Sequence, residues 1–429
     1  MTTNSTTISF VNDNDNEYRL INDKKRSSNV LGRALCCASC LGVFNVESGG
    51  NETPFIRGTS FDVIVVEGRN GKLFQNSDFL VSFKGKNKNE DDTHRIVMEL
   101  EQENPDISGT TTKAWFPIQP QHSTVDSDND NEGFDVKRFW DCCHPMADNA
   151  KPNMMHDLYD GRDECDQDTS FALKAFLKPG RNNMRYLLLD DQQIIGVAYA
   201  YIFLLKHNDT IAISDIDGTI TKSNIRGVLG TIVTRQYERV CHVGICHLLS
   251  GLSSSSQVVY VTSRPISLAS QTRHFLSNLR QGNITLPQGP LLGFEGNMSQ
   301  LFMMEKISKT TQKFKAEKLS KQVIQPFRSA TNDLKSPFFV IGIGNTMMDV
   351  QAYHAIGMDL NRIYMINKKS HIISFEGAST FEREDGDSDG DGILSFPPQQ
   401  WYKGRIGAKF NGYTDPKLLS QLGINTDMK

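Results

Sequence analysis

Short apolar runs alternate with stretches of helical spacing from Thr210 onward. Four runs have the composition of buried strands, namely TIAIS, QVVYVT, FFVIGIG and RIYMIN, which begin at residues 210, 257, 338 and 362. Helical spacing between or after them predicts helices at 267–280, 299–325 and 349–356. Strands that alternate with helices predict an α/β fold, with a doubly wound parallel sheet over residues 209–375.

The amino-terminal half has the shorter period of β-structure. The runs SFDVIVVEG and DFLVSF flank an Asn-Gly turn signal and predict a hairpin within 58–85. Further β-like runs lie near 169–177, 184–189 and 194–205. The last is too short to span a membrane and is rich in β-formers, so we expect a buried strand. Because neither group makes a complete sandwich alone, we predict one β-sandwich formed by 29–103 and 169–208 and split by an acidic, flexible insertion at 104–168.

Both ends of the chain lack this regularity. Residues 1–28 are polar without periodicity and are predicted to be disordered. Residues 29–44 carry apolar positions at helical spacing, together with Cys36, Cys37 and Cys40, behind the basic lead KKR. This amphipathic helix either lies on a membrane, where the cysteines are candidate acylation sites, or packs on its own domain. The tail at 376–429 mixes aromatic and basic residues, and either a membrane or the preceding domain remains open as its partner.

Composition narrows the class of protein. A length of 429 residues suggests two or three compact units, and a formal net charge of −4 gives no basic field for nucleic acid. No apolar run reaches the roughly 18 residues of a membrane-spanning helix. The polar, acidic amino terminus is unlike a secretory signal, and eight cysteines in a chain of this length are no disulfide scaffold. We therefore expect a reduced, cytoplasmic environment.

Candidate chemistry gathers where the strands of the predicted sheet end. The stretch IAISDIDGTITKS places Asp215 and Asp217 at a strand tip, followed by Gly218 for a tight bend and by Thr219, which offers a hydroxyl and an amide to an anion. Thr262 ends the second strand, the helix from 299 carries Lys313 and Lys315, and GNTMMD places Asn345 and Asp349 at a helix start. Since paired acids repel each other, a metal ion is the simplest partner, and we expect three aspartates to meet around it.

This order of motifs resembles the haloacid dehalogenase phosphatase superfamily. The resemblance implies that Asp215 is the nucleophile and that Asp217 is the general acid and base. It further implies Mg²⁺ held by Asp215, the backbone carbonyl of Asp217 and Asp349, while Thr262 and Lys315 neutralise the phosphoryl oxygens. As a lone acid at a helix start, Asp349 would need no ligand, because the helix dipole already favours it.

The flanking sequences SDIDGTITKS, LPQGPLL and LNRIY, together with the 58–85 hairpin, resemble the lipin family of Mg²⁺-dependent phosphatidate phosphatases. The family fold implies an immunoglobulin-like sandwich completed by the strands before the catalytic domain. The family reaction implies phosphatidic acid as substrate and diacylglycerol as product in glycerolipid synthesis, at a membrane surface contacted through residues 29–44. The expected location is the cytoplasm and the endoplasmic reticulum membrane, with a nuclear location open. Candidates for the lipid phosphate or the anionic surface are Lys222, Arg264 and Arg273; Gly218, Thr219 and Asn345 complete the predicted substrate site.

The sequence also departs from the family pattern. TTQKFK lacks the first lysine and the proline of the family's lysine motif, so Lys315 takes that role with Lys313 in reserve. Thr346 stands where the family has a cationic residue, and Asn224 replaces an aspartate. The acidic loop 385–394 lacks the glutamate that a Ca²⁺ loop needs, and DCCH at 141–144 lacks a second Cys/His pair for zinc.

Two alternative functions remain open. One is a phosphatase of soluble monoesters or phosphoproteins, and the other is a module that binds phosphatidic acid without hydrolysis. The retained Asp215, Asp217 and Asp349 favour catalysis over such a binding module.

Overall fold

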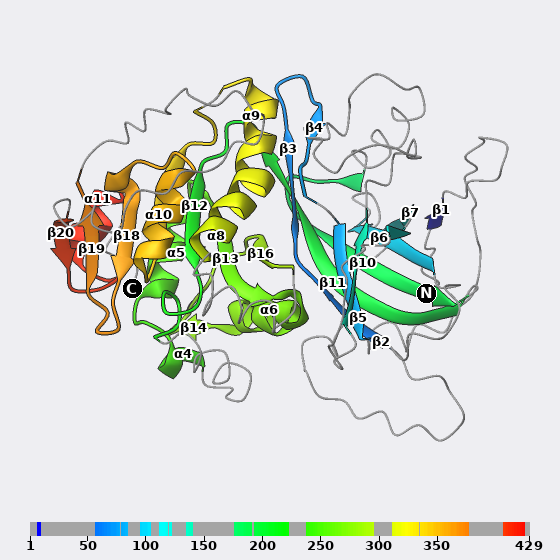
Figure 1. Cartoon of the computed structure of the whole chain (residues 1–429), viewed down its shortest axis with the longest axis horizontal. Helices are drawn as coiled ribbons and strands as arrows, with labels where there is room; N and C mark the ends of the chain where they lie inside the picture. Colours follow the sequence, from blue (N-terminus) through cyan, green and yellow to red (C-terminus); the bar gives the residue numbers. More distant parts are fainter. Residues whose placement is uncertain are drawn as a thin grey trace.

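Two β-sheets organise the chain in the computed structural model (Figure 1). The parts of the chain that the structure describes are residues 7–9, 56–77, 79–84, 95–103, 111–118, 120–121, 134–139, 176–190, 193–222, 237–295, 311–333, 335–376 and 406–424. The predicted helix at 29–44 with its cysteines, the acidic loop 385–394, DCCH at 141–144 and Asn224 lie outside these ranges.

The amino-terminal sheet contains eleven strands from the described residues, in the order β1-β7-β6-β10-β11-β2-β5-β9-β8, with β3 pairing β11 and β4. Their bounds are β1 Thr7–Ser9, β2 Ile56–Ser60, β3 Val63–Glu67, β4 Leu73–Phe74, β5 Phe79–Lys84, β6 Arg95–Glu103, β7 Thr111–Ile118, β8 Pro120–Gln121, β9 Phe134–Phe139, β10 Gly180–Asp190 and β11 Gln193–Lys206. The strands predicted at 184–189 and 194–205 are confirmed as parts of β10 and β11. The run at 169–177 is not a described strand: Phe176 is helical, Leu177 is irregular, and 169–175 lie outside the described ranges.

The predicted hairpin forms with a different partner. After the turn at Gly68–Gly71, β3 pairs with the short strand β4, whereas β5 pairs with β2 and β9. The Asn-Gly signal therefore marks a real turn, but a tight turn pairs the residues directly beside it, and the chain bends again before β5.

Strands before and after the predicted insertion pair directly with each other. β10 lies antiparallel to β6, and β11 lies parallel to β2 and β3. The insertion itself is less irregular than its acidic composition suggests, because β7, β8 and β9 fall inside 104–168. β7 pairs with β6, β9 pairs with β5, and β8 pairs with β9. Likewise, β1 pairs with β7 within the segment predicted to be disordered. Composition does not predict these strands, because each is stabilised by hydrogen bonds to a partner strand elsewhere in the sequence rather than by its own residue types.

The second sheet has the predicted parallel core with two antiparallel strands added at one edge. Its order is β16-β13-β12-β17-β18-β19-β20, and the first five strands run parallel. The bounds are β12 Ile211–Asp215, β13 Gln257–Pro265, β16 Leu291–Phe294, β17 Phe339–Gly344, β18 Ile363–Ile366, β19 Ile372–Phe375 and β20 Ile406–Phe410. A separate short hairpin joins β14 Arg280–Gln281 to β15 Ile284–Thr285. The predicted α/β architecture is thus confirmed at the level of its parallel sheet.

Helices cover both faces of this sheet (Figure 1). Two of the three predicted helices match α6 and α10. The third, predicted at 299–325, is helical from 311 onward through α8 and a π-helical turn, η3, and continues as α9 to Thr331; residues 299–310 lie outside the described ranges. The bounds are α4 Tyr237–Val240, α5 Ile245–Leu252, η1 Ile266–Leu268, α6 Ala269–Asn278, α8 Thr311–Leu319, η3 Ser320–Ile324, α9 Gln325–Thr331, α10 Met347–Ala355, η4 Leu360–Arg362 and α11 Pro416–Gln421. In the described part of the chain, no helix is both long and apolar enough to cross a bilayer.

Alternate residues of the central strands enter two different cores. In β12, Ala212 packs toward the core that contains α5, α6 and α11, whereas Ile211 and Ile213 pack toward α8, α9 and α10. The second core also contains Ile64 of β3 and Phe203 of β11. The amino-terminal sheet therefore shares buried apolar surface with the parallel sheet, and this packing joins the two regions.

A buried ion pair strengthens this junction. Asp62 lies between β2 and β3 and accepts a 2.7 Å bond from Nη2 of Arg273 on α6. The same carboxylate accepts from the backbone amides of Tyr201 and Leu291, so it binds strands of both sheets. Arg273 also donates to the carbonyls of Ser60 and Tyr199. Arg273 is thus a contact between the two sheets, and its suggested role as a lipid-phosphate ligand is wrong, because its charge is already bound.

The tail docks on the preceding α/β domain over residues 406–424. β20 pairs with β19, and Leu418, Leu419 and Ile424 enter the core beside α5. The sequence leaves either a membrane or the preceding domain as the partner of the tail. For residues 406–424 the structure shows that the partner is the preceding domain.

Candidate active site

Asp215 ends β12, the middle one of the five parallel strands, and is buried, with 3% of its surface exposed. The chain turns immediately after it, and Gly218 adopts a φ of 87°, a left-handed conformation that favours glycine. This turn brings the Thr219 hydroxyl back to Asp215, where it donates to Oδ2 over 2.9 Å. The turn that the sequence predicts is therefore formed, and it holds one oxygen of Asp215.

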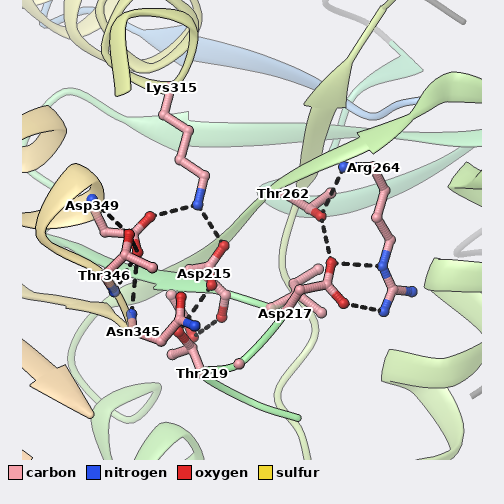
Figure 2. A network of polar contacts seen from close by, with 12 residues as sticks. Asp215, Asp217, Thr219, Thr262, Arg264, Lys315, Asn345, Thr346 and Asp349 are labelled. Carbon is pink, nitrogen blue, oxygen red and sulfur yellow. Dashed lines mark hydrogen bonds and ion pairs between the residues drawn. The ribbon is translucent and has the colours of Figure 1, made fainter. Parts of the chain in front are cut away.

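Lys315 and Asp349 meet Asp215 from two other elements. Lys315 extends from α8, and its Nζ lies 2.6 Å from Asp215 Oδ1 and 2.6 Å from Asp349 Oδ1 (Figure 2). All three residues are buried. Two aspartates that are far apart in the sequence thus share one cation, as the spacing of the strand ends predicts.

Asp349 is held by the start of α10. Its Oδ2 accepts bonds from the amides of Asn345 and Thr346 and from the Thr346 hydroxyl, and Thr346 caps the helix in return. At the end of β17, a Cβ on Gly344 would lie 2.3 Å from Asp349 Cβ, so only glycine allows this approach. Asp349 is therefore a helix-capping acid that also faces the site.

The site holds more negative than positive charge. Burial raises the pKa of Asp215 to about 7; Lys315 opposes this rise and Asp349 adds to it. Burial also acts to raise the pKa of Asp349, but Lys315 and bonds from Thr346 hold it below its ordinary value. Although burial works against it, the two carboxylates raise the pKa of Lys315. One ammonium compensates two carboxylates incompletely, so the site favours further positive charge.

Asp217 lies apart from this cluster. Its carboxylate accepts bonds from Arg264 Nε over 2.8 Å and from Arg264 Nη2 over 2.6 Å, and the Thr262 hydroxyl lies 3.3 Å from Oδ2 (Figure 2). Arg264 is buried and donates also to Thr272. The predicted substrate ligand Arg264 is therefore bound to a carboxylate in this structure, and Thr262 faces Asp217.

The comparisons with known proteins bear on residues 166–383. These residues match the family model described as LNS2 (Lipin/Ned1/Smp2), which covers half of the chain. The chain belongs to the LNS2 family. Asp215, Asp217, Thr262, Lys315 and Asp349 all lie within the matched residues.

Several curated proteins are similar to this LNS2 region. Nuclear elongation and deformation protein 1 of Schizosaccharomyces pombe is 31% identical over 48% of this chain and 30% of its own length. Human phosphatidate phosphatase LPIN1 is 32% identical over 48% of this chain and 22% of its own length. Phosphatidic acid phosphohydrolase 1 of Saccharomyces cerevisiae is 28% identical over 48% of this chain and 24% of its own length. The matched region therefore spans less than a third of each relative.

The other predicted ligands of the LNS2 site differ in what they contact. The Gly218 amide donates to Thr221, and the Thr219 amide donates to the Ile216 carbonyl. These two amides and the Thr219 hydroxyl therefore act within the turn and do not face an anion, because a closed turn satisfies its own donors. Lys222 is exposed just beyond the turn. Asn345 is half-buried, and its backbone amide donates a hydrogen bond to Asp349. Lys313 is exposed and pairs with Glu317 on the same helix, so of the two lysines Lys315 enters the site.

The residues present fit a hard divalent cation by their chemistry. Two buried carboxylates converge on one cationic position, their charge is incompletely compensated, and oxygen ligands are those that Mg²⁺ prefers. The Asp215 and Asp349 side chains meet there, whereas Arg264 binds the Asp217 carboxylate; the contribution expected from Asp217 is its backbone carbonyl. Across the described ranges, no group of three or more His, Cys, Asp or Glu side chains is arranged as a metal site.

Sequence reasoning missed the partner of Asp217. Thr262 and Arg264 lie two residues apart in β13, and alternate residues of a strand face the same side. This period places Arg264 beside Thr262 at the strand tip, which is the signal that would have assigned it to Asp217. His242, Ser370 and Tyr413 also contact the turn or each other, and no motif marks them.

Proposed function

We propose that this LNS2 protein is a Mg²⁺-dependent phosphatidate phosphatase, which hydrolyses phosphatidic acid to diacylglycerol and phosphate. The observation that carries the proposal is the convergence of Asp215 and Asp349 on Lys315 at the end of the central strand. The similar proteins named phosphatidate phosphatase or phosphatidic acid phosphohydrolase support the choice of substrate.

Asp215 is the proposed nucleophile. One carboxylate oxygen attacks phosphorus, the bond from phosphorus to the diacylglycerol oxygen breaks, and an aspartyl-phosphate forms. Asp217 gives its proton to the departing alkoxide and later takes a proton from the water that hydrolyses the aspartyl-phosphate. Because Arg264 binds Asp217 in the structure, this assignment requires the Asp217 side chain to turn toward the reacting oxygens.

Charge compensation falls to Lys315 and to the metal. Lys315 orients Asp215 and neutralises phosphoryl oxygens. Thr262 is the proposed hydrogen-bond donor to the same phosphoryl oxygens. Asp215, Asp349 and the backbone carbonyl of Asp217 are the proposed Mg²⁺ ligands. When bound, Mg²⁺ supplies positive charge for the phosphoryl group and for the two acids. Lys222 and Asn345 remain proposed substrate contacts at the rim of the site.

The domain plan is part of the proposal. Residues 29–103 and 169–208 form one immunoglobulin-like sandwich split by 104–168, before a catalytic domain at 209–375 and a tail at 376–429. The pairing of β6 with β10 supports this plan, as does a third apolar core, which joins Val63, Val81 and Met98 to Tyr186 and Ile202.

Peripheral membrane binding is proposed through residues 29–44, at the cytoplasmic face of the endoplasmic reticulum. A phosphatase of a bilayer lipid must reach its substrate at the surface, and this segment has the required amphipathic pattern. Removing residues 1–45 is expected to reduce activity on vesicles more than activity on detergent-dispersed substrate. Equal losses on both substrates contradict the membrane role.

The deciding experiment measures phosphate release from phosphatidate vesicles with and without Mg²⁺, beside a panel of water-soluble phosphomonoesters. The proposal expects Mg²⁺-dependent release that is strongest on the vesicles. Stronger release from soluble esters supports the broader phosphatase alternative. Vesicle binding without release from any substrate supports a binding module instead.

A further inference from the structure

The catalytic turn is held from outside through three successive backbone carbonyls. The Gly218 carbonyl lies 3.3 Å from Nε2 of His242, the Thr219 carbonyl accepts a 3.0 Å bond from the Tyr413 hydroxyl, and the Ile220 carbonyl accepts from the His242 amide over 3.0 Å. These carbonyls directly follow Asp217 in the sequence. The turn that carries the proposed nucleophile Asp215 and the proposed acid Asp217 is therefore held by His242 and Tyr413, which belong to none of the sequence motifs described above.

The orientation of His242 is fixed on both sides of its ring. The Gly218 carbonyl can only accept a hydrogen bond, so Nε2 must carry the proton and Nδ1 must accept. Nδ1 lies 2.8 Å from the Ser370 hydroxyl, which can donate to it. Burial lowers the pKa of His242, in keeping with a neutral ring.

Tyr413 comes from the carboxyl-terminal segment, beyond the residues that match the LNS2 family model. Its ring is 1% exposed and meets the His242 ring edge-on, with centroids 6.1 Å apart. Burial raises the pKa of Tyr413 well above its ordinary value, so the hydroxyl remains a donor. The segment is anchored by Leu418 and Leu419 in the core, which keeps Tyr413 in place.

Thr219 connects this clamp to the nucleophile. The Thr219 carbonyl accepts from Tyr413, while the hydroxyl of the same residue donates to Asp215 Oδ2 over 2.9 Å. A shift of the Thr219 backbone would therefore move the group that holds one oxygen of Asp215. A nucleophile must approach phosphorus at a defined distance and direction, so small displacements of such a group slow the reaction.

We propose that Tyr413 and His242 are positioning residues, which fix the catalytic turn so that Asp215 faces the phosphorus atom. The inference rests on the proposed phosphatase function, and it assigns a role in the reaction to the carboxyl-terminal segment. Neither residue touches substrate; each acts through the carbonyls of the turn.

The test compares two tyrosines: Tyr413, which lies in the carboxyl-terminal segment, and Tyr364, which contacts that segment through Gln421. Tyr413→Phe removes only the hydroxyl that holds the turn. The matched control is Tyr364→Phe, which makes the same chemical change at another buried tyrosine. The Tyr364 hydroxyl accepts a 3.0 Å bond from Gln421 on α11 and, within the described part of the chain, makes no hydrogen bond to the turn. Tyr413→Phe is expected to lower kcat about fivefold, the factor of roughly one net hydrogen bond, with KM unchanged. Tyr364→Phe is expected to leave both constants unchanged.

A second pair of variants tests His242. Gln at position 242 can still donate to the Gly218 carbonyl, whereas Leu cannot, so His242→Gln is expected to retain more of kcat than His242→Leu. Thermal unfolding is measured for all four variants. Equal kcat for Tyr413→Phe and Tyr364→Phe, or losses of kcat that simply follow the melting temperature, overturn the inference.

The proposed function can fail separately. Each protein is assayed on phosphatidate vesicles and on p-nitrophenyl phosphate. An inactive wild-type protein on both substrates overturns the phosphatase proposal and the inference with it. A wild-type protein that is active only on the soluble ester overturns the lipid substrate, and the positioning role is then decided by kcat on that ester.

Discussion

Asp215 and Asp217 are separated by one residue, yet the structure places them in opposite environments. Asp215 is buried between Lys315 and Thr219 and shares its cation with Asp349. Asp217 is 14% exposed and is bound by a single arginine that also reaches Thr272. Burial raises the pKa of Asp215 to about 7. Two acids separated by one residue can therefore take different chemical roles when their partner side chains come from different helices and strands.

The largest expected effect is that of Asp215→Asn. The change keeps the shape of the side chain but removes the nucleophilic oxygen, so phosphate release is expected to fall about a thousandfold or more. Asp359→Asn, at a half-exposed aspartate paired with Arg362, is the control and should retain activity. Substantial phosphate release by folded Asp215→Asn would show that the nucleophile is another residue.

Lys315→Met removes the cation that joins Asp215 to Asp349. Phosphate release is expected to fall about a hundredfold or more, because developing phosphoryl charge loses its partner. Stability is also expected to drop by about 3–5 kcal/mol, since two buried carboxylates lose their counter-ion. Lys313→Met serves as the control, because Lys313 is exposed and its pair with Glu317 is long, at 3.8 Å. Similar losses in both variants would contradict the choice of Lys315; denaturant unfolding separates activity from stability.

Asp217→Asn tests the other half of the comparison. A general acid matters most when the leaving group is a poor one, so release from phosphatidate is expected to fall about a hundredfold. The loss should be much smaller on p-nitrophenyl phosphate, whose leaving group needs little protonation. Asp215→Asn should fail equally on both substrates. If Asp217→Asn also fails equally on both, the acid role belongs elsewhere.

The smallest effect is expected from Arg264→Lys. Lysine keeps the charge but cannot form the two parallel bonds to Asp217, so the carboxylate is oriented less well. We expect kcat on phosphatidate to change by about tenfold or less, with little change on p-nitrophenyl phosphate. Arg280→Lys, at an exposed arginine of β14, is the matched control. An unchanged kcat with a raised KM would instead indicate that Arg264 binds substrate.

The catalytic sheet and the Asp215 cluster could be predicted because both follow from local patterns. Apolar strands buried on both faces are continuous in the sequence, and their carboxyl ends must lie at one edge of a parallel sheet. This rule predicts that Asp215 and Asp349 lie close together, as the structure has them, whereas Lys315 lies on helix α8 and its place follows from the family resemblance.

The partner of Asp217 and the clamp on the turn depend on side-chain pairing that no short motif encodes. The charge of Arg264 near the motifs suggests a substrate ligand, whereas its pairing with Asp217 is apparent only in the structure. Tyr413 reaches Thr219 across 194 residues of chain, and the segment around it had no recognised pattern. The strands β7 to β9 were hidden for a similar reason, since their acidic flanks dominated the composition. Non-local pairing decides such elements, and a single sequence does not display it.

The ion pair between Asp62 and Arg273 has a consequence for how the gene can be divided. A protein expressed from residue 209 onward would lack Asp62 and the carbonyls of Ser60 and Tyr199 that bind Arg273, and it would present to water the apolar surface that Ile64 and Phe203 cover. Such a fragment is expected to aggregate during expression, although it includes every residue of the Asp215 cluster. The two regions are therefore expected to fold stably only in each other's presence, either within one chain or as two co-expressed fragments.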